Sequence, residues 1–233
     1  MSTKKMIVSA NQPYFFPYPG FFYKAHHSDI FVILDDVQFP RGTTWTTRNR
    51  FKNHQGSLWI TVPVKKKGLG LQKISAVRIC HDGKWEKKHL ESLKHAYVNA
   101  PYLKDHLNFL EELFSTKFEK LIDLNLKTIR HLMKHLQIDT KIILLSELNI
   151  KEKGNRLLIE ICKKLGATQF LAQRAARKYL DTNRFKESGI GLTDINPTSP
   201  VYPQLWGSFI QNLSALDLVL NCGLKAHDIM IAG

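Results

Sequence analysis

The chain has 233 residues, of which 43% are hydrophobic and 23% are charged. These proportions are typical of a folded globular protein, and they exclude a disordered chain, a collagen-like repeat and a coiled coil. Lysine and arginine number 34 against 20 aspartate and glutamate residues, for a net charge of +14. Such an excess favours an anionic partner, such as a nucleotide, a phosphorylated sugar, RNA, an acidic carrier protein or an anionic membrane surface. The alternative is a basic surface with no partner.

The cysteines and the apolar stretches indicate a cytoplasmic protein. Cys80, Cys162 and Cys222 are widely spaced and form no C-x-x-C motif, which favours reduced thiols over a zinc knuckle or a disulfide framework. The first ten residues lack the long apolar run of a signal peptide. No segment approaches the ~20 apolar residues that a membrane-spanning helix needs. We therefore expect no integral membrane segment.

The first third of the chain predicts a strand, a loop, a helix and a second strand, followed by a hairpin. The loop is aromatic and rich in proline, which keeps it out of a regular helix. The second strand is a continuous apolar run, typical of a parallel sheet buried on both faces. The hairpin is indicated by alternating apolar residues after a turn at 54–56. The expected elements are strand 6–10, helix 20–27 and strands 30–34, 48–52, 58–64 and 71–80.

The pattern is helical over about 83–137, and strands and helices then alternate. The alternating elements are strand 141–145, helix 155–165, strand 168–172, helix 175–187 and strand 191–195. Such alternation implies right-handed crossovers and a parallel sheet. We predict one α/β domain over 1–233, with a Rossmann-like, mostly parallel sheet flanked by helices, an antiparallel hairpin and a helical insertion. Near the end, Ser214 and Asp217 have the spacing of a capping box that opens a docked helix.

Polar residues follow the first two strands, where an open parallel sheet binds its ligands. Gln12 comes after the first strand, and Asp35 and Asp36 come after the second. A carboxylate at this place can act as a general base, a metal ligand or an acceptor for a sugar hydroxyl. The alternative is a turn that ends the strand, where aspartate is common.

The stretch from Gln38 to Arg50 carries further candidates. In an extended strand Arg48, Arg50 and Lys52 share one face and Asn49 lies on the other. Arginine forks grip phosphate or carboxylate groups, as Arg41 could as well, and an exposed tryptophan such as Trp45 stacks on a base or a sugar. The alternative is an edge strand that its charges protect from aggregation.

The remaining sequence motifs do not indicate a particular reaction. His131 and His135 have the i, i+4 spacing of a zinc pair, but they lie off the apolar stripe and no H-E-x-x-H motif is present. We expect solvated surface histidines and no metal. Walker A, G-x-S-x-G and dinucleotide-binding motifs are absent from the sequence. In the C-terminal part, Tyr202 and Gln204 are candidates for a pocket.

Several of these segments together resemble the WbqC-like family, in the family's own order. They are residues 11–23, 35–39, 45–50, 59–63 and 213–217. The family is associated with bacterial surface-polysaccharide (O-antigen) gene clusters. The resemblance implies a cytoplasmic step on an activated sugar, such as the attachment of an acyl or aminoacyl group to an amino sugar. It carries over Gln12, Asp35, Asp36, Gln38, Arg48, Asn49 and Arg50 as family-motif residues, with Tyr202, Gln204 and Asp217 beside them.

Two main functions follow as hypotheses. The first is a transferase for acyl, aminoacyl or glycosyl groups that acts on an anionic substrate such as a nucleotide sugar, with an acyl-carrier protein or a tRNA as donor. Asp35 or Asp36 is then the catalytic base, and the substrate-binding residues are Gln12, Gln38, Arg41, Trp45, Arg48, Asn49, Arg50, Tyr202 and Gln204. The second is a non-catalytic module that binds RNA or an acidic carrier protein. A structural component of a polysaccharide-assembly complex is the third option, and the sequence names no cofactor.

Overall fold

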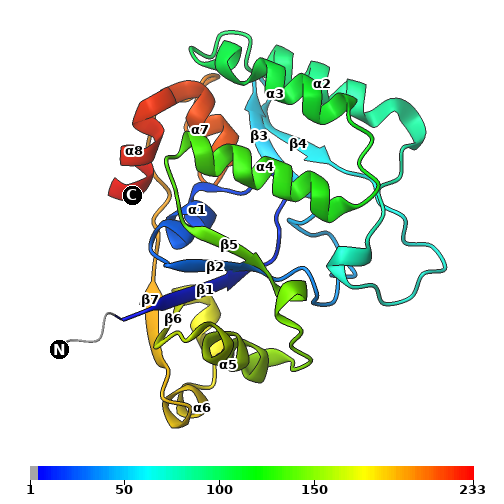
Figure 1. The fold of residues 1–233 in the computed structure, drawn as a ribbon. Coiled ribbons are helices and arrows are strands. Elements are labelled where there is room, and N and C mark those ends of the chain that lie inside the picture. The colour runs from blue at the N-terminus through cyan, green and yellow to red at the C-terminus, as the bar shows by residue number, and fades with distance from the viewer. Residues whose placement is uncertain (1–4) are drawn as a thin grey trace.

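A five-stranded parallel sheet lies at the centre of the molecule (Figure 1). The structure is a computed structural model, and it describes residues 5–233. The strands follow one another across the sheet as β5, β2, β1, β6 and β7, each parallel to its neighbour. Their bounds are β1 (Ile7–Asn11), β2 (Ile30–Ile33), β5 (Lys141–Leu144), β6 (Gln169–Gln173) and β7 (Gly191–Ile195). The prediction of an α/β fold with a parallel sheet is confirmed.

Helices cover both faces of this sheet (Figure 1). On one face lie α1, α4, α7 and α8, and on the other lie α5 and α6. The helices are α1 (Pro19–His26), α2 (Trp85–Ala96), α3 (Leu103–Ser115), α4 (Leu121–His135), α5 (Gly154–Leu165), α6 (Thr182–Glu187), α7 (Ala215–Cys222) and α8 (Ala226–Ala232). None of these helices combines the length and the hydrophobicity needed to cross a bilayer within residues 5–233.

Alternation along β2 explains why both faces are covered. Phe31 and Ile33 belong to the apolar cluster under α1 and α4, whereas Val32 belongs to the cluster under α5. Consecutive side chains of a strand point to opposite faces, so an unbroken apolar strand needs a layer on each side.

The chain between β2 and β5 forms a layer of its own above the sheet (Figure 1). It contains the antiparallel hairpin β3 (Arg48–Asn53) and β4 (Gly56–Thr61) as well as α2, α3 and α4. Phe16, from the loop after β1, packs edge-on against Phe51 of the hairpin at 5.7 Å between ring centroids. One apolar cluster is therefore continuous from the sheet to the inserted helices.

Two predicted elements are wrong. Residues 71–80 form no strand, because their amides bond to scattered partners: Ile74 donates to the carbonyl of Val37, and Ile79 to that of Glu119. Only a 3-10 turn, Ile74–Ala76, forms there. The helix predicted over 175–187 is divided into a 3-10 turn (Arg174–Tyr179) and α6, because the Asp181 side chain caps a new helix by accepting from the amide of Arg184.

The predicted capping box at α7 is half right. Ser214 caps the helix, and its Oγ accepts from the amide of Leu216 at 3.2 Å. Asp217 is buried and accepts instead from the hydroxyls of Tyr97 and Tyr202, at 2.7 and 2.8 Å. Its carboxylate ties α7 to α2 and to the segment that precedes α7.

Candidate functional site

A cleft of about 590 Å³ opens at the carboxyl ends of β2 and β5. Asp36, Gln38 and Lys73 line one side, and Lys151, Glu152 and Lys153, just before α5, line the other. Ligands of open parallel sheets bind beyond the carboxyl ends of the strands, and the cleft opens at this edge. It lies beside the point between β1 and β6 where the strand order reverses, not at that point. The cleft is also in the size range of small-molecule pockets.

Asp36 and Lys73 form an ion pair on the wall of this cleft. The Nζ atom of Lys73 lies 2.8 Å from a carboxylate oxygen of Asp36. An isolated backbone bridge between Gln38 and Lys73 holds the two segments of the wall together. The Asp36 side chain is 26% exposed, so its carboxylate can meet a ligand in the cleft.

Asp35 lies beneath the same cleft and is only 2% exposed. Its two carboxylate oxygens accept from the backbone amide and the hydroxyl of Ser146, at 2.9 and 2.7 Å. Its backbone carbonyl accepts from the amide of Ser75 at 2.8 Å. These contacts make Asp35 a positioning residue that fastens two loops under the cleft, and they distinguish it from Asp36.

A smaller cavity of about 340 Å³ adjoins the cleft, and the two share Leu71 and Gln72 in their walls. Arg41 and Lys66 line it. The Nζ atom of Lys66 also lies 5.1 Å from the centroid of the Phe39 ring. The walls of the cleft and its neighbour carry more basic side chains than acidic ones. The basic ones are Arg41, Lys66, Lys73, Lys151 and Lys153, and the acidic ones are Asp36 and Glu152. This excess favours an anion.

The hairpin carries a second group of candidates, away from the cleft. Trp45 and Trp59 are 42% and 41% exposed, and their rings stack with centroids 5.8 Å apart. The guanidinium of Arg48 lies over the Trp59 ring at 4.1 Å. Arg50 donates to the carbonyls of Gln211 and Asn212.

Each of the three neighbouring cations predicted on this strand therefore has its own contacts within the protein. Arg48 stacks on a tryptophan, Arg50 bonds to backbone, and Lys52 is buried. Lys52 donates to Oε1 of Gln204 at 3.2 Å and to the carbonyl of Gly207. No shared anion is needed to separate the charges.

Three predicted binding residues have supporting positions instead. Asn49 is 1% exposed and donates to the carbonyls of Phe15 and Phe16, which fixes the aromatic loop after β1. Tyr202 bonds to Asp217, and Gln204 bonds to both backbone groups of Ile210. These contacts use the polar atoms that would otherwise meet a substrate.

Comparison with known proteins identifies the family of this chain. The model of the WbqC-like protein family matches residues 12–229. The chain belongs to the WbqC-like protein family. It is also similar to "Uncharacterized protein Rv1507c" of Mycobacterium tuberculosis, with 32% identity over 230 residues and 97% of each chain covered. No solved structure matches it.

In this WbqC-like chain the family-motif residues divide between the cleft and its support. Asp36 and Gln38 line the cleft, and Asp35 and Asn49 hold loops in place. Arg41, which is not one of the family-motif residues, lines the adjoining cavity. The lysines of the cleft were missed in the sequence, because isolated lysines in loops carry no periodic signal. Their place just before the helix that follows β5 was the signal available.

Lys24 is a further residue that the sequence pattern did not single out. It lies on α1, near the point between β1 and β6 where the strand order of the WbqC-like sheet reverses. Its Nζ atom donates to the carbonyl of Ala10 and to Oδ1 of Asn11, each at 2.8 Å. Burial lowers the pKa of Lys24 to about 7. Gln12 follows directly after this strand end and is half-buried.

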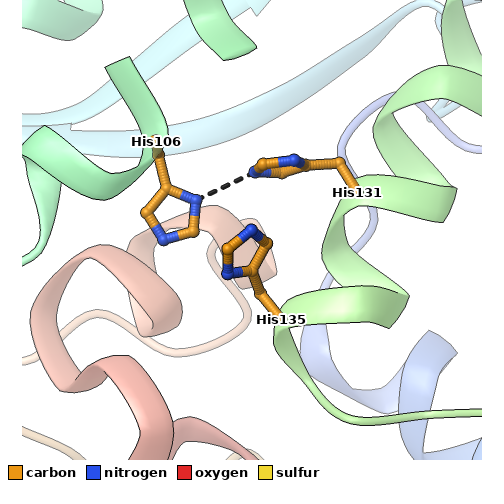
Figure 2. A group of neighbouring side chains, drawn as sticks. All are labelled: His106, His131 and His135. Carbon is orange, nitrogen blue, oxygen red and sulfur yellow. Dashed lines mark hydrogen bonds between the residues drawn. The ribbon is translucent and has the colours of Figure 1, made fainter. Parts of the chain in front are cut away.

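The expectation of solvated histidines on α4 is wrong. His131 and His135 are half-buried, and a third ring, His106 of α3, is fully buried beside them (Figure 2). The two residues lie off the main apolar stripe of α4, as the spacing predicts, but the neighbouring helix covers that side.

Proposed function

We propose that this WbqC-like protein is a transferase that acts on a nucleotide-linked or otherwise phosphorylated amino sugar. Its place is a cytoplasmic step of surface-polysaccharide biosynthesis, and an acyl or aminoacyl group is the group transferred. The observation that supports this proposal is the basic cleft at the carboxyl ends of β2 and β5, with a reachable carboxylate on its wall.

The phosphate groups would bind among Lys73, Lys151 and Lys153. The latter two are exposed and lie before the first turn of α5, where free backbone amides and the helix dipole add to their positive charge. Arg41 and Lys66 of the adjoining cavity extend the same basic surface. Gln38 supplies hydrogen bonds that fix the orientation of the sugar.

Asp36 is the proton acceptor in this proposal. It takes a proton from the amine or hydroxyl of the sugar as that group attacks the acyl carbon of the donor. The new bond forms as the donor's bond to its carrier breaks, and the carrier leaves with that electron pair. Lys73, at 2.8 Å, orients the carboxylate for the transfer.

Ligand binding is the first test. We would measure thermal unfolding with UDP- and dTDP-linked amino sugars, coenzyme A and a short RNA. A ligand at about 100 times its dissociation constant adds about 2.7 kcal/mol of stability. We expect a shift with a nucleotide sugar that is lost in the double variant Lys151→Ala, Lys153→Ala and kept in Lys163→Ala, at the far end of α5. Equal shifts in all three proteins would contradict the binding site.

Turnover is the second test. In Asp36→Asn we expect the rate to fall by about 10²–10⁴ while binding is kept, which is the usual contribution of a general base. A rate equal to that of the wild type would remove Asp36 from the mechanism and leave only a binding cleft.

A non-catalytic module for RNA or an acidic carrier protein is the second candidate. The exposed pair Trp45 and Trp59, with Arg48 over one ring, favours it, because bases stack on such surfaces. Affinity for RNA would fall steeply with salt and depend on Trp59. A shift with RNA that salt abolishes, with none from a nucleotide sugar, would decide for this candidate.

A further inference from the structure

Three histidines meet between two helices of the inserted layer. His131 and His135 lie one turn apart on the same side of α4, and His106 faces them from α3 (Figure 2). One nitrogen of each ring lies within 4.8 Å of one nitrogen of both others. His106 is 2% exposed.

Neighbouring contacts hold these rings in place. A hydrogen bond of 2.9 Å joins Nδ1 of His106 to Nε2 of His131 (Figure 2). Phe109, one turn after His106 on α3, stacks flat on the His131 ring, with centroids 3.5 Å apart and an interplanar angle of 5°. The centroid of the His135 ring is 4.3 Å from that of His106 and 4.5 Å from that of His131.

Burial favours the neutral form of all three rings. Burial and the neighbouring positive groups lower the pKa of His131 to about 3, and burial and His135 lower that of His106 to about 4. The pKa of His135 is lowered as well, mainly by burial. Neutral imidazole is the form that coordinates a metal.

We propose that His106, His131 and His135 form a binding site for a divalent transition-metal ion, with zinc as its occupant. Imidazole ligands suit Zn, Cu, Ni and Co, and zinc accepts three histidines with water as a fourth ligand. Zn–N bonds of about 2.0–2.1 Å in a tetrahedron place the nitrogens roughly 3.3 Å apart. Small side-chain rotations bring nitrogens that lie within 4.8 Å to that spacing.

The charged groups around the cluster have opposite effects on a bound cation. Asp105, beside His106 on α3, favours a cation, whereas Lys127 and Lys134 of α4 disfavour it. The bound ion would link α3 to α4. This site is separate from the cleft at the sheet edge, and none of its three histidines lines that cleft.

The test uses the full chain without a histidine tag, freed of metal by dialysis against a chelator. It is titrated with Co²⁺, and the visible absorption of tetrahedral cobalt is recorded. We expect a band that saturates at one equivalent and disappears when Zn²⁺ is added. His131→Gln and His135→Gln should each weaken binding by no less than the roughly 10–100-fold that loss of a second-sphere group costs.

His227→Gln is the matched control, because His227 and His26 form another histidine contact, with centroids 5.3 Å apart, on α8 and α1. It should bind Co²⁺ like the wild type. Zinc should also raise the unfolding midpoint of the wild type and of this control, but of neither α4 variant. A wild type without the cobalt band, or a band of equal affinity in both α4 variants, would overturn the proposal.

Discussion

The ammonium group of Lys24 donates to Oδ1 of Asn11 at 2.8 Å, deep in the molecule and at the carboxyl end of the central strand β1. Lys24 has no carboxylate partner in the part of the chain that the structure describes. A shift of its pKa from 10.5 to about 7 means that the protonated side chain costs the folded state roughly 5 kcal/mol.

We expect the Lys24→Met substitution to change the pH dependence of stability. In the unfolded chain this lysine titrates near 10.5, so between pH 7 and 10.5 the unfolded state binds more protons than the folded state. The free energy of unfolding of the wild type therefore rises with pH across this window. Lys24→Met should lose that rise, as measured by urea unfolding at pH 7 and pH 10. The exposed-lysine variant Lys87→Met should keep it, and equal slopes in all three proteins would refute the buried, shifted amine.

The histidine cluster predicts a loss of stability at low pH. Unfolded histidines titrate near 6.5, whereas His106 and His131 keep pKa values of about 4 and about 3 in the folded chain. Stability is therefore complete above pH 6.5 and falls as the pH drops toward 4. In metal-free protein, the His131→Phe substitution should reduce this loss, and the exposed-residue variant His95→Gln should not. Urea midpoints at pH 7, 5.5 and 4.5 measure the difference, and identical losses would count against the cluster.

Asp217→Ala should destabilise the protein by about 2–5 kcal/mol, because the hydroxyls of Tyr97 and Tyr202 lose their buried acceptor. Urea unfolding followed by circular dichroism measures this loss. Asp228→Ala is the control: its side chain is 87% exposed on α8, and the change should stay within about 0.5 kcal/mol. A small effect at Asp217 would mean that the three residues do not form one buried network.

The two aspartates after β2 should differ in how much their substitution destabilises the protein, and this test needs no substrate. Asp35→Ala should cost about 1–3 kcal/mol, because the amide and hydroxyl of Ser146 lose their acceptor. Asp36→Ala should cost less than about 1 kcal/mol, because its partner Lys73 is largely exposed. Chemical denaturation of both variants measures the difference. Equal costs would show that the two carboxylates do not have the distinct roles assigned to them.

Much of the fold was predictable from the sequence because it depends on local periodicity. The apolar run 30–34 and the predicted strand 191–195 belong to strands with parallel neighbours. Alternation placed Asn49 and Arg48 on different faces of the hairpin, and Asn49 is buried while Arg48 is not. The same argument gave a wrong strand at residues 71–80, because Ile74, Val77 and Ile79 are buried without a ladder of strand hydrogen bonds.

The sites were less predictable because they depend on contacts between distant segments. His106 and His131 meet only when α3 packs on α4, and Asp217 is recruited by two tyrosines from other elements. Lys24 reads in the sequence as a surface lysine of an amphipathic helix. It is buried where α1 packs against β1 and β6, and a single sequence does not show that contact.

The order of the central sheet has a consequence for how the chain folds. β2 and β5 are hydrogen-bonded neighbours, with Ile30 opposite Lys141, yet the hairpin and three helices lie between them along the chain. Closing so long a loop carries an entropic cost before any contact is gained, and such pairings slow folding. During synthesis, β2 leaves the ribosome long before β5 is made, so the backbone groups along one edge of this apolar strand have no strand partner until then. We expect the inserted layer to collapse first and to shield that edge until β5 arrives.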